Sequence, residues 1–403
     1  MKGANMDTKN VESLTAMFEA AYGPSDGRKL LLVLSPGRTE IAGNHTDHEG
    51  GHVIAAAVDR YVQGIFCANK SDVMRVNSEG YGLVEIGTDD LVAREDERGT
   101  TASLVRGMAA LFKQRGYEPA GFDAALRSDV LGGSGLSSSA AFELELGQAM
   151  NALWADGKLA PEELALMAQR AEREWFGKPC GLMDQAAVAL GGIQHMNFCD
   201  PTKLMANSLD FDFEANGYAI CIVAVGADHA ANIDDYAAVP AEMQAIAREL
   251  GKHVLSDVSE QEVIQAVPQL REALGDRAVL RALHYFHEEE LVSSRVGALR
   301  SADMKAFLTY TRYSGISSAM LLQNVSVGGA SEQPSMLAIA LSEGILRGAG
   351  ATRVHGGGFG GTIQAFVPLS MVDEYRAGMD AVFGEGACGV YGVDHEGARA
   401  QWL

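Results

Sequence analysis

Basic residues are scarce in this sequence. Its 403 residues include 32 Lys and Arg against 53 Asp and Glu, which gives a formal net charge of −21 at pH 7. A nucleic-acid-binding protein needs a basic surface to contact the phosphate backbone, so this balance argues against that class of function. A site for a single nucleotide is compatible with the balance, because such a site needs only a few local hydrogen-bond donors.

Paired cysteines and long apolar runs are also missing. The five cysteines are odd in number and none belongs to a C-x-x-C pair, which is typical of free thiols in a reducing compartment. No run of about eighteen apolar residues indicates a membrane helix. The first ten residues contain no apolar core of the kind that a signal peptide needs. We therefore expect a cytoplasmic protein with no membrane partner.

The chain is long enough for two domains with a substantial core. Hydrophobic residues make up 47% and charged residues 21% of the sequence, as in ordinary soluble globular proteins. Near residue 200 the sequence becomes polar and irregular, and a new apolar strand is expected from Tyr218. We expect a domain boundary here, which divides the chain into residues 1–205 and 206–403.

A glycine- and serine-rich stretch, LGGSGLSSSAAFE at Leu131–Glu143, follows an expected strand at Gly121–Val130. A helix is expected after it, since apolar residues recur at three- and four-residue steps: Leu136, Ala140, Leu144, Gly147 and Met150. Glycines let a backbone approach a ligand closely, and the first amides of a helix have no internal partners. This strand–loop–helix pattern therefore favours a phosphate site over a simple flexible turn.

Two better-known loop motifs do not fit this stretch. It lacks the lysine of a Walker A loop, and Leu136 stands where a nucleophile elbow needs a glycine. Three consecutive serines, Ser137–Ser139, stand at the expected start of the helix. Their hydroxyls are suitable ligands for a hard cation such as magnesium.

A dense polar segment, PGRTEIAGNHTDHEGGH at Pro36–His52, lies between two expected strands and is predicted to be a loop. Loops held between core strands often carry function, and five polar residues crowd here: Arg38, Asn44, His45, Asp47 and Glu49. One hypothesis is a zinc site of the histidines at 45, 48 and 52, although Gly50-Gly51 would break the helix needed to align the last two. The alternatives are surface histidines and, for His45 and Asp47, binding of substrate hydroxyls.

Asp184 is a lone acid between apolar residues in CGLMDQAAVAL. An aspartate before an apolar helical run is usually a helix cap, here for a helix from Gln185 onward. The functional alternative is a partly buried carboxylate that orients or deprotonates a hydroxyl group.

Gly356–Gly361 contains five glycines in six positions and matches G-x-G-x-x-G. A helix must follow that dinucleotide-binding motif, but Thr362–Val367 has the pattern of a strand, so we expect a strand–loop–strand hairpin. Five glycines exceed the needs of a tight turn. We therefore predict that this backbone approaches a ligand closely.

Four segments together resemble the GHMP small-molecule kinases and, within them, the galactokinases. They are PGRTEIAGNHTDHEGG, GSGLSSSAAFE, KPCGLMDQ and GATRVHGGGFGG, and the match runs from about Leu30 to Val367. The resemblance implies an α+β fold with a ribosomal-protein-S5-like N-terminal domain, a ferredoxin-like C-terminal domain and an active site between them. It also implies ATP-dependent phosphorylation of a sugar, first of all galactose, at its anomeric hydroxyl. We expect a monomer or a weak homodimer.

The resemblance also implies roles for individual residues. Arg38 and Asp184 would be catalytic, and Glu172 with the middle serine, Ser138, would bind Mg²⁺, with Ser137 as the alternative serine. The ATP phosphates would be bound by Gly133, Ser134, Gly135, Leu136, Ser137, Ser138 and Ser139. The sugar contacts would be Asn44, His45, Asp47, Gly181 and Tyr236. The second glycine-rich loop would comprise Gly356, Gly357, Gly358, Gly360 and Gly361.

Four positions depart from the family pattern. Galactokinases usually have a glutamate, which contacts the 6-hydroxyl of the sugar, where this chain has Asn44; Glu40 replaces an asparagine, His355 a threonine and Leu131 a proline. Asparagine keeps a hydrogen-bonding group but loses the charge, so galacturonate, arabinose and N-acetylgalactosamine are alternative substrates. A non-catalytic sugar sensor is a third alternative, and the intact serine loop and catalytic pair argue against it.

Overall fold

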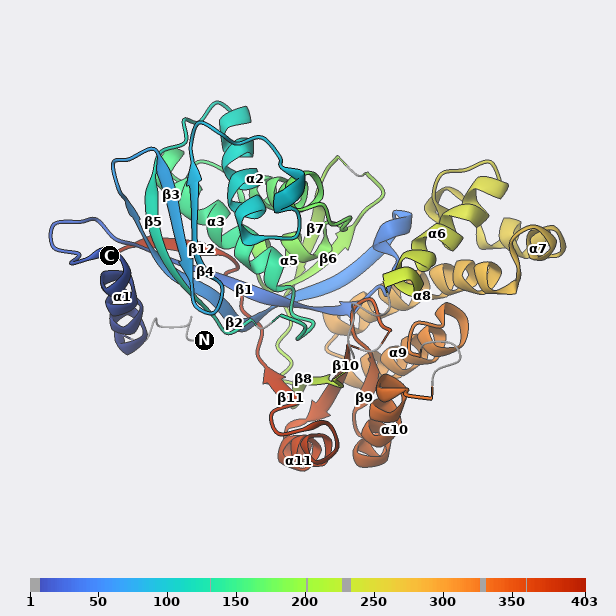
Figure 1. The fold of residues 1–403 in the computed structure, drawn as a ribbon. Helices are drawn as coiled ribbons and strands as arrows, with labels where there is room; N and C mark the ends of the chain where they lie inside the picture. Colours follow the sequence, from blue (N-terminus) through green and yellow to red (C-terminus); the bar gives the residue numbers. More distant parts are fainter. Residues whose placement is uncertain (1–7, 131, 201, 227–232, 327–330, 360) are drawn as a thin grey trace.

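The computed structural model describes residues 8–130, 132–200, 202–226, 233–326, 331–359 and 361–403. Two β-sheets organise this part of the chain (Figure 1). The larger sheet has eight strands in the order β12-β1-β2-β5-β3-β4, with β6 paired to β2 and β7 paired to β6. Its strands are β1 (Leu31–Ala42), β2 (His52–Ala68), β3 (Val73–Ser78), β4 (Gly82–Gly87), β5 (Phe122–Ser128), β6 (Ile193–Asn197), β7 (Met205–Leu209) and β12 (Arg399–Trp402).

The long strand β2 connects the two halves of the larger sheet. Its first residues, His52–Ala56, pair with β6, and its last residues, Val62–Ala68, pair with β5. β1 runs antiparallel beside β2, with one register shift on each side of Arg38. Such bulges bend a strand and redirect its side chains, and they are frequent next to active sites.

The predicted polar loop at Pro36–His52 is wrong in its first part. β1 continues to Ala42, and all twelve of its residues are buried. Buried polar side chains are tolerated where hydrogen bonds satisfy them, and Thr39, for example, accepts a hydrogen bond at 2.7 Å from Gln364 of the second sheet. The strand is polar because it lies between two domains and bonds to both.

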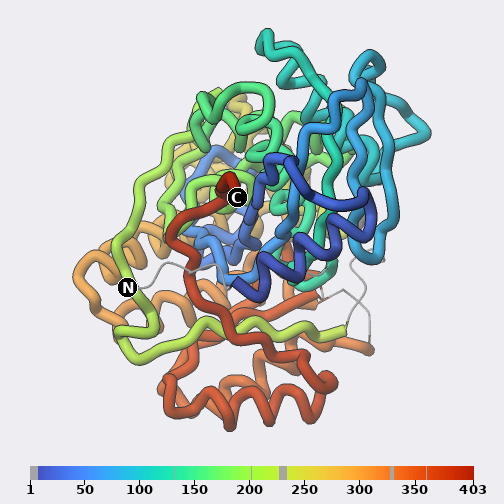
Figure 2. The backbone as a smooth tube through the Cα atoms, turned by 90° about the vertical axis from the view of Figure 1, so that its left-hand side faces the viewer, coloured from blue at the N-terminus to red at the C-terminus, as the bar shows by residue number. Residues whose placement is uncertain are grey.

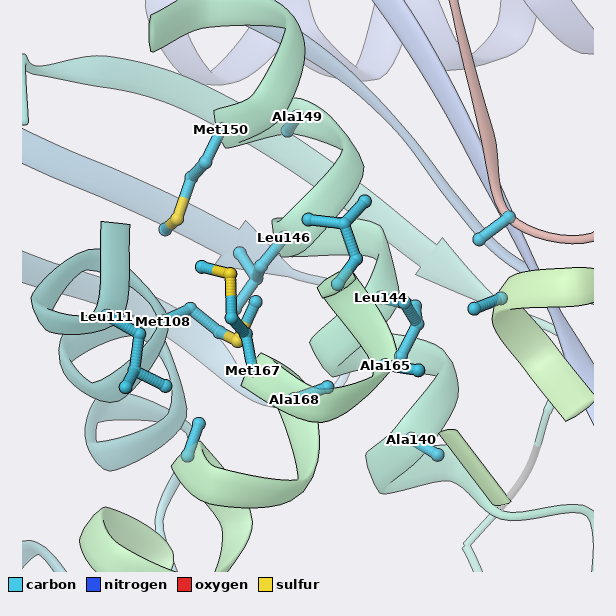
Figure 3. Packing of buried hydrophobic residues seen from close by; sticks show 14 of the residues in the cluster. Met108, Leu111, Ala140, Leu144, Leu146, Ala149, Met150, Ala165, Met167 and Ala168 are labelled. Carbon is cyan, nitrogen blue, oxygen red and sulfur yellow. The ribbon is translucent and has the colours of Figure 1, made fainter. Parts of the chain in front are cut away.

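Helices cover both faces of the larger sheet. On one face, α2 (Thr101–Gln114), α3 (Ser138–Trp154), α4 (Pro161–Ala171) and α5 (Met183–Leu190) pack together around a core that includes Met108, Leu144 and Met167 (Figure 3). On the other face, α1 (Thr8–Tyr22) buries Leu14 and Phe18. The expected helix after the glycine–serine loop is α3, so the strand–loop–helix prediction is confirmed.

The smaller sheet has the strand order β11-β8-β10-β9 and is antiparallel throughout. Numbered by their place in the chain, its strands follow the order 4-1-3-2 of a ferredoxin-like sheet, as expected. They are β8 (Tyr218–Ala224), β9 (Ala351–Val354), β10 (Thr362–Pro368) and β11 (Cys388–Tyr391). On the side away from the larger sheet lie α10 (Pro334–Leu346) and α11 (Val372–Phe383) (Figure 1).

Four further helices join β8 to α10 and lie beside the far ends of β1 and β2 (Figure 1). They are α6 (Ile233–Glu249), α7 (Glu260–Leu274), α8 (Asp276–Arg300) and α9 (Met304–Ser317). Helix α6 packs against the short 3₁₀ turn Asp47–Glu49. This arrangement brings the polar end of β1 between the two domains.

The end of the described chain returns to the larger sheet. β12 pairs antiparallel with β1, with Leu31 opposite Trp402. Figure 2 shows this C-terminal segment rising from the layer of the smaller sheet to that of the larger one. β7 also lies in the larger sheet although it begins at Met205. The division into residues 1–205 and 206–403 stays a prediction, and these two strands show where sheet pairing departs from it.

Two expectations from composition can be compared with the structure. All five cysteines are free thiols, as their odd number suggests. Among the residues that the structure describes, none of the helices is long and apolar enough to cross a membrane.

Candidate active site

Arg38 and Asp184 form an ion pair with two parallel hydrogen bonds. Arg38 Nε donates to Asp184 Oδ1 at 2.7 Å, and Nη2 donates to Oδ2 at 2.8 Å. Arg38 Nη1 donates to the carbonyl oxygen of Gly135, and Ser137 Oγ donates to Asp184 Oδ2 at 2.6 Å. β1, the glycine–serine loop and α5 therefore meet at one point, which holds both residues predicted to be catalytic.

The surroundings keep Asp184 charged. Burial raises the pKa of its carboxyl group, but the charge of Arg38 and the hydrogen bonds from Arg38 and Ser137 outweigh burial and lower the pKa to about 2. At neutral pH the carboxylate can only accept hydrogen bonds. It is therefore suited to accept one from a substrate hydroxyl.

Asp184 lies inside α5 and not at its cap. The helix begins at Met183 after the N-cap residue Leu182, so the helix-cap prediction for Asp184 is wrong. In the first turn a carboxylate benefits from the positive end of the helix dipole. Its side chain is free to pair with Arg38 because the cap does not need it.

The glycine–serine loop leaves its backbone accessible. Gly133 and Gly135 have φ values of 79° and 76°, and Ser137 also adopts the left-handed conformation at 60°. A Cβ atom at Gly133 would meet no atom within 4 Å. Leu136 anchors the loop, since its side chain is buried and its carbonyl accepts a hydrogen bond from the Arg38 amide at 3.0 Å. α3 starts directly after this loop, so its first amides have no hydrogen-bond partner inside the helix.

Glu172 is the buried carboxylate beside the loop. It is 1% exposed, and its Oε1 accepts hydrogen bonds from Ser139 Oγ and Lys178 Nζ, each at 2.8 Å. Its Oε2 accepts one from Gln185 Nε2 at 2.8 Å. The serine bonded to Glu172 is thus Ser139, one position after the predicted Ser138.

Glu172 and Ser139 offer oxygens of the kind that bind magnesium, and the Lys178 ammonium group bonds to the same Glu172 oxygen in this structure. Mg²⁺ prefers oxygen ligands and is usually held by one or two carboxylates together with water and substrate phosphates. The zinc hypothesis finds no support, because no three His, Cys, Asp or Glu side chains converge as a metal site in the described part of the chain. His52, one of the three histidines considered, bonds instead to Glu289 at 2.7 Å.

Four of the predicted sugar contacts lie together. A Cβ atom at Gly181 would be 2.3 Å from Asp47 Oδ2, and the rings of His45 and Tyr236 are 5.3 Å apart. A Cβ atom at Gly357 would lie 2.1 Å from the Tyr236 ring, so this ring also packs against the second glycine-rich loop.

His45 offers an unused acceptor to this cluster. Its Nε2 lies 3.0 Å from the carbonyl oxygen of Gly357, so Nε2 carries the proton and donates it. Burial lowers the pKa of the ring to about 3, so the imidazole is neutral at pH 7. Its Nδ1 is buried and has no partner, and a neutral ring with a protonated Nε2 can accept a hydrogen bond there from a hydroxyl group.

Asn44 does not belong to this cluster. Its side chain is fully buried, and its Nδ2 donates to the carbonyl oxygen of Gly356 at 2.6 Å. Its Oδ1 accepts hydrogen bonds from Asn324 at 2.8 Å and Ser318 at 3.2 Å. The amide is occupied by the C-terminal domain.

Glu40, which replaces an asparagine of the family pattern, also forms hydrogen bonds across the domains. Its Oε1 pairs with the fully buried Arg353, whose Nη1 donates to the carbonyl of Ile41 at 2.9 Å. The same Oε1 lies 3.4 Å from Asn44 Nδ2. Asn44 and Glu40, two of the four departures from the family pattern, are thus direct neighbours in one polar interface between the domains.

The second glycine-rich loop is the expected hairpin. β9 and β10 pair antiparallel, with Val354 opposite Ile363. A Cβ atom at Gly357 would lie 2.1 Å from the Tyr236 ring, and one at Gly358 would lie 2.2 Å from the carbonyl oxygen of Asn324. Gly360 lies outside the described residues. At these two positions the close neighbour that requires glycine is the protein itself.

Sequence reasoning did not find three residues of the site. Lys178 and Gln185 contact Glu172, and Glu143 Oε2 accepts a hydrogen bond from the same Gln185 amide at 3.1 Å. Lys178 and Gln185 both belong to KPCGLMDQ, the segment already noted for Asp184. Their polar character inside an apolar stretch was the available signal.

Two sequence models of known families match the chain. The N-terminal domain of GHMP kinases matches residues 103–192, which include the glycine–serine loop, Glu172 and Asp184. The galactose-binding signature of galactokinases matches residues 16–66, which include Arg38 and Asp47.

Curated relatives and solved structures agree with these matches. A galactokinase of Streptomyces coelicolor is 31% identical over 359 residues, 87% of each chain, and one of Actinobacillus pleuropneumoniae is 30% identical over 364 residues, 90% of this chain and 91% of its own. The fold is similar to that of Lactococcus lactis galactokinase complexed with galactose, with a TM-score of 0.81 at 23% identity, covering 98% of this chain and 100% of that one. A mevalonate kinase structure gives a TM-score of 0.64 at 13% identity, with 90% and 98% covered. The chain therefore belongs to the galactokinase family of the GHMP kinases.

Proposed function

We propose that this protein transfers the terminal phosphoryl group of ATP to the anomeric hydroxyl of galactose. The observation that carries the proposal is the ionised Asp184, held by Arg38 and Ser137 between the open glycine–serine loop and the cluster around Asp47 and Tyr236. The loop offers amides for phosphates, and the cluster offers acceptors for sugar hydroxyls. Relatives that match most of the chain are named galactokinases.

In the proposed reaction, Asp184 accepts a hydrogen bond from the anomeric hydroxyl. This contact directs the hydroxyl oxygen of the sugar toward the terminal phosphorus of ATP. The new bond joins the sugar oxygen to that phosphorus, and the bond from phosphorus to the bridging oxygen of ADP breaks. The hydroxyl proton passes to Asp184 as the new bond forms. Phosphoryl transfer depends mostly on such positioning and on charge stabilisation, and the fixed charge of Arg38 lies beside the reacting groups.

ATP would be accompanied by Mg²⁺. Glu172 and Ser139 would hold the ion, because they are the carboxylate and hydroxyl that the fold brings together at the loop. When bound, the ion would offset the charge that develops on the phosphate oxygens. The rest of the cradle would be the loop amides from Gly133 to Ser139, including the side chains of Ser134 and Ser138 at its partly exposed surface.

The preference at C6 of the sugar is the open point within this proposal. Because the Asn44 amide bonds Gly356 and Asn324, it adds neither charge nor a free donor to the sugar cluster. A 6-hydroxyl would then be recognised by other groups, such as the unpartnered Nδ1 of His45. Galacturonate and arabinose, which differ from galactose at C6, are therefore the competing substrates, with N-acetylgalactosamine as a further candidate. We also propose a cytoplasmic monomer or weak homodimer.

The test is ADP release with ATP and Mg²⁺ over galactose, 2-deoxygalactose, glucose, galacturonate, arabinose and N-acetylgalactosamine. We expect the highest kcat/KM for galactose. Preference for galacturonate or arabinose would make that sugar the substrate in place of galactose, with Asn44 as the cause to test next. Binding of ATP and sugar without ADP release would contradict the proposed kinase activity and favour the alternative of a non-catalytic sugar sensor.

A further inference from the structure

We propose that Lys178 is a phosphate-binding residue of this site, whose ammonium group contacts the terminal phosphate of the bound nucleotide. The inference rests on the proposed function for the identity of the nucleotide. It names a contact that lies in neither the glycine–serine loop nor the Arg38–Asp184 pair. Four observations carry it, on the position, the exposure, the charge and the local backbone of this lysine.

Lys178 lies beside the first turn of α3. Lys178 Nζ and Ser139 Oγ bond to the same oxygen, Glu172 Oε1, each at 2.8 Å. Ser139 lies in the first turn of α3, where unpaired backbone amides favour an anion. A phosphate bound by these amides therefore lies within reach of the Lys178 ammonium.

The exposure of Lys178 differs from that of its partner. The Lys178 side chain is 52% exposed, whereas the Glu172 side chain is 2% exposed. The ammonium group has three N–H donors, and the contact with Glu172 uses one of them on the inner side. The lysine thus reaches from solvent to the buried carboxylate and keeps donors on the outer side, where a nucleotide would enter.

Charge at the site also favours this role. Arg38, the cation paired with Asp184, uses Nε, Nη1 and Nη2 for Asp184 and the carbonyl of Gly135. Its charge is largely matched by Asp184, and its fork is fixed. Lys178 is a compact charge on a flexible stem, which suits a group that must follow a phosphate during transfer.

The backbone holds Lys178 in place. Glu172–Phe176 forms a π-helical turn that ends at Gly177 with φ 86°. The amides of Gly177 and Lys178 both donate to the carbonyl of Glu172, at 2.9 and 3.1 Å. This turn folds the chain back so that the Lys178 side chain lies over the Glu172 carboxylate.

The experiment compares binding of ATP and of adenosine, measured by isothermal titration calorimetry in EDTA, for the native chain and for Lys178→Met, Lys178→Gln and Lys178→Arg. Lys158→Met is the control, because Lys158 is also exposed and paired with an acid, Asp156, but lies outside the site. We expect both neutral variants to weaken ATP binding by about 10- to 100-fold, the value of one charge-assisted hydrogen bond. Lys178→Arg should stay within about threefold of the native chain, and adenosine binding should not change in any variant.

The comparison of ATP with adenosine distinguishes a phosphate contact of Lys178 from a structural role. If both neutral variants bind ATP as tightly as the native chain does, Lys178 does not bind phosphate. The same conclusion follows if both variants weaken the binding of ATP and of adenosine equally. Turnover with the best sugar should show the same loss as a higher KM for ATP, with the KM for the sugar unchanged. If the native chain phosphorylates no sugar, the proposed function fails, but the comparison of ATP with adenosine still decides the role of Lys178.

Discussion

Gly133 in the first glycine-rich loop and Gly358 in the second lie in opposite surroundings. In the first loop a Cβ atom at Gly133 would meet nothing within 4 Å, whereas in the second a Cβ atom at Gly358 would lie 2.2 Å from the Asn324 carbonyl. Both glycines have nearly the same φ, 79° and 80°. Gly133 thus leaves open space beside the first loop, whereas Gly358 makes room for a neighbouring part of the chain. Each loop also holds a glycine of the other kind, since a Cβ atom at Gly135 would lie 2.7 Å from Thr362 Oγ1 and one at Gly356 would meet nothing within 4 Å.

The difference shows that glycine content alone does not locate a binding loop. The second loop is held by the Asn44 amide, the His45 ring and the Asn324 carbonyl, and it presses against the Tyr236 ring. It contacts His45 and Tyr236, two of the proposed sugar contacts. The first loop contacts the proposed catalytic pair directly, since its Ser137 hydroxyl and Gly135 carbonyl bond Asp184 and Arg38.

The largest effect is expected at the pair beside the first loop. Asp184→Asn removes the carboxylate that would accept the hydroxyl proton, so we expect kcat to fall by about 10²- to 10⁴-fold, the usual range for a positioned base. Steady-state kinetics with galactose measures this, and an unchanged melting temperature together with normal ATP binding shows that the fold survives. A loss smaller than about tenfold would mean that Asp184 only orients the sugar.

Substituting alanine for one glycine in each loop makes the comparison quantitative. Alanine at a φ near 80° costs about 1–2 kcal/mol in either loop, but Gly358→Ala also pushes a Cβ into the Asn324 carbonyl. Such overpacking costs a further 1–3 kcal/mol, roughly. We therefore expect urea unfolding to show Gly358→Ala less stable than Gly133→Ala by about that amount. Equal stabilities would mean that the second loop can move away at no cost, and that the two loops are alike.

Asn44→Ala removes the anchor of the second loop. It leaves the Gly356 carbonyl and the Asn324 amide with one partner fewer inside the protein, so we expect a loss of about 1–3 kcal/mol in stability. The KM for ATP should stay unchanged, because the first loop is untouched. Ser138→Ala in the first loop is the matched control, with the opposite expected pattern. A selective change in sugar preference without loss of stability would instead indicate a direct sugar contact by Asn44.

The smallest effect is expected from acid. The pKa of Asp184 is lowered from 3.8 to about 2 in the folded protein, so its pairing with Arg38 stabilises the fold above pH 3.8 and is lost as the pH falls toward 2. The contribution is at most about 2 kcal/mol by linkage. Unfolding of the native chain and of Asp184→Asn, followed at pH 7 and at pH 3, should show a smaller stability difference at pH 3. A constant difference would mean that the pairing does not shift the pKa.

Much of this arrangement could be predicted from the sequence because it depends on local patterns. The strand–loop–helix around the serines and the hairpin after His355 follow from residue patterns, and the resemblance named Arg38 and Asp184 together, although not their ion pair. The ferredoxin-like strand order likewise followed from the resemblance. Such patterns do not say which of two neighbouring residues meets a given partner, because one residue more or less changes the direction of a side chain.

Two side chains show why. Successive residues on a helix point about 100° apart, so the choice between Ser138 and Ser139 depends on the residue at which α3 begins, which spacing alone does not fix. Asn44 lies just beyond a strand with two register shifts, and its direction depends on those bulges and on Asn324, which is 280 positions away. A long-range contact of this kind leaves no periodic signal near residue 44.

The pairing of β12 with β1 gives the C-terminal domain two covalent connections to the larger sheet, one between β7 and β8 and one between β11 and β12. Any movement of one domain relative to the other must therefore bend both connections at the same time. A single proteolytic cut in either connection would leave the two halves joined by the other.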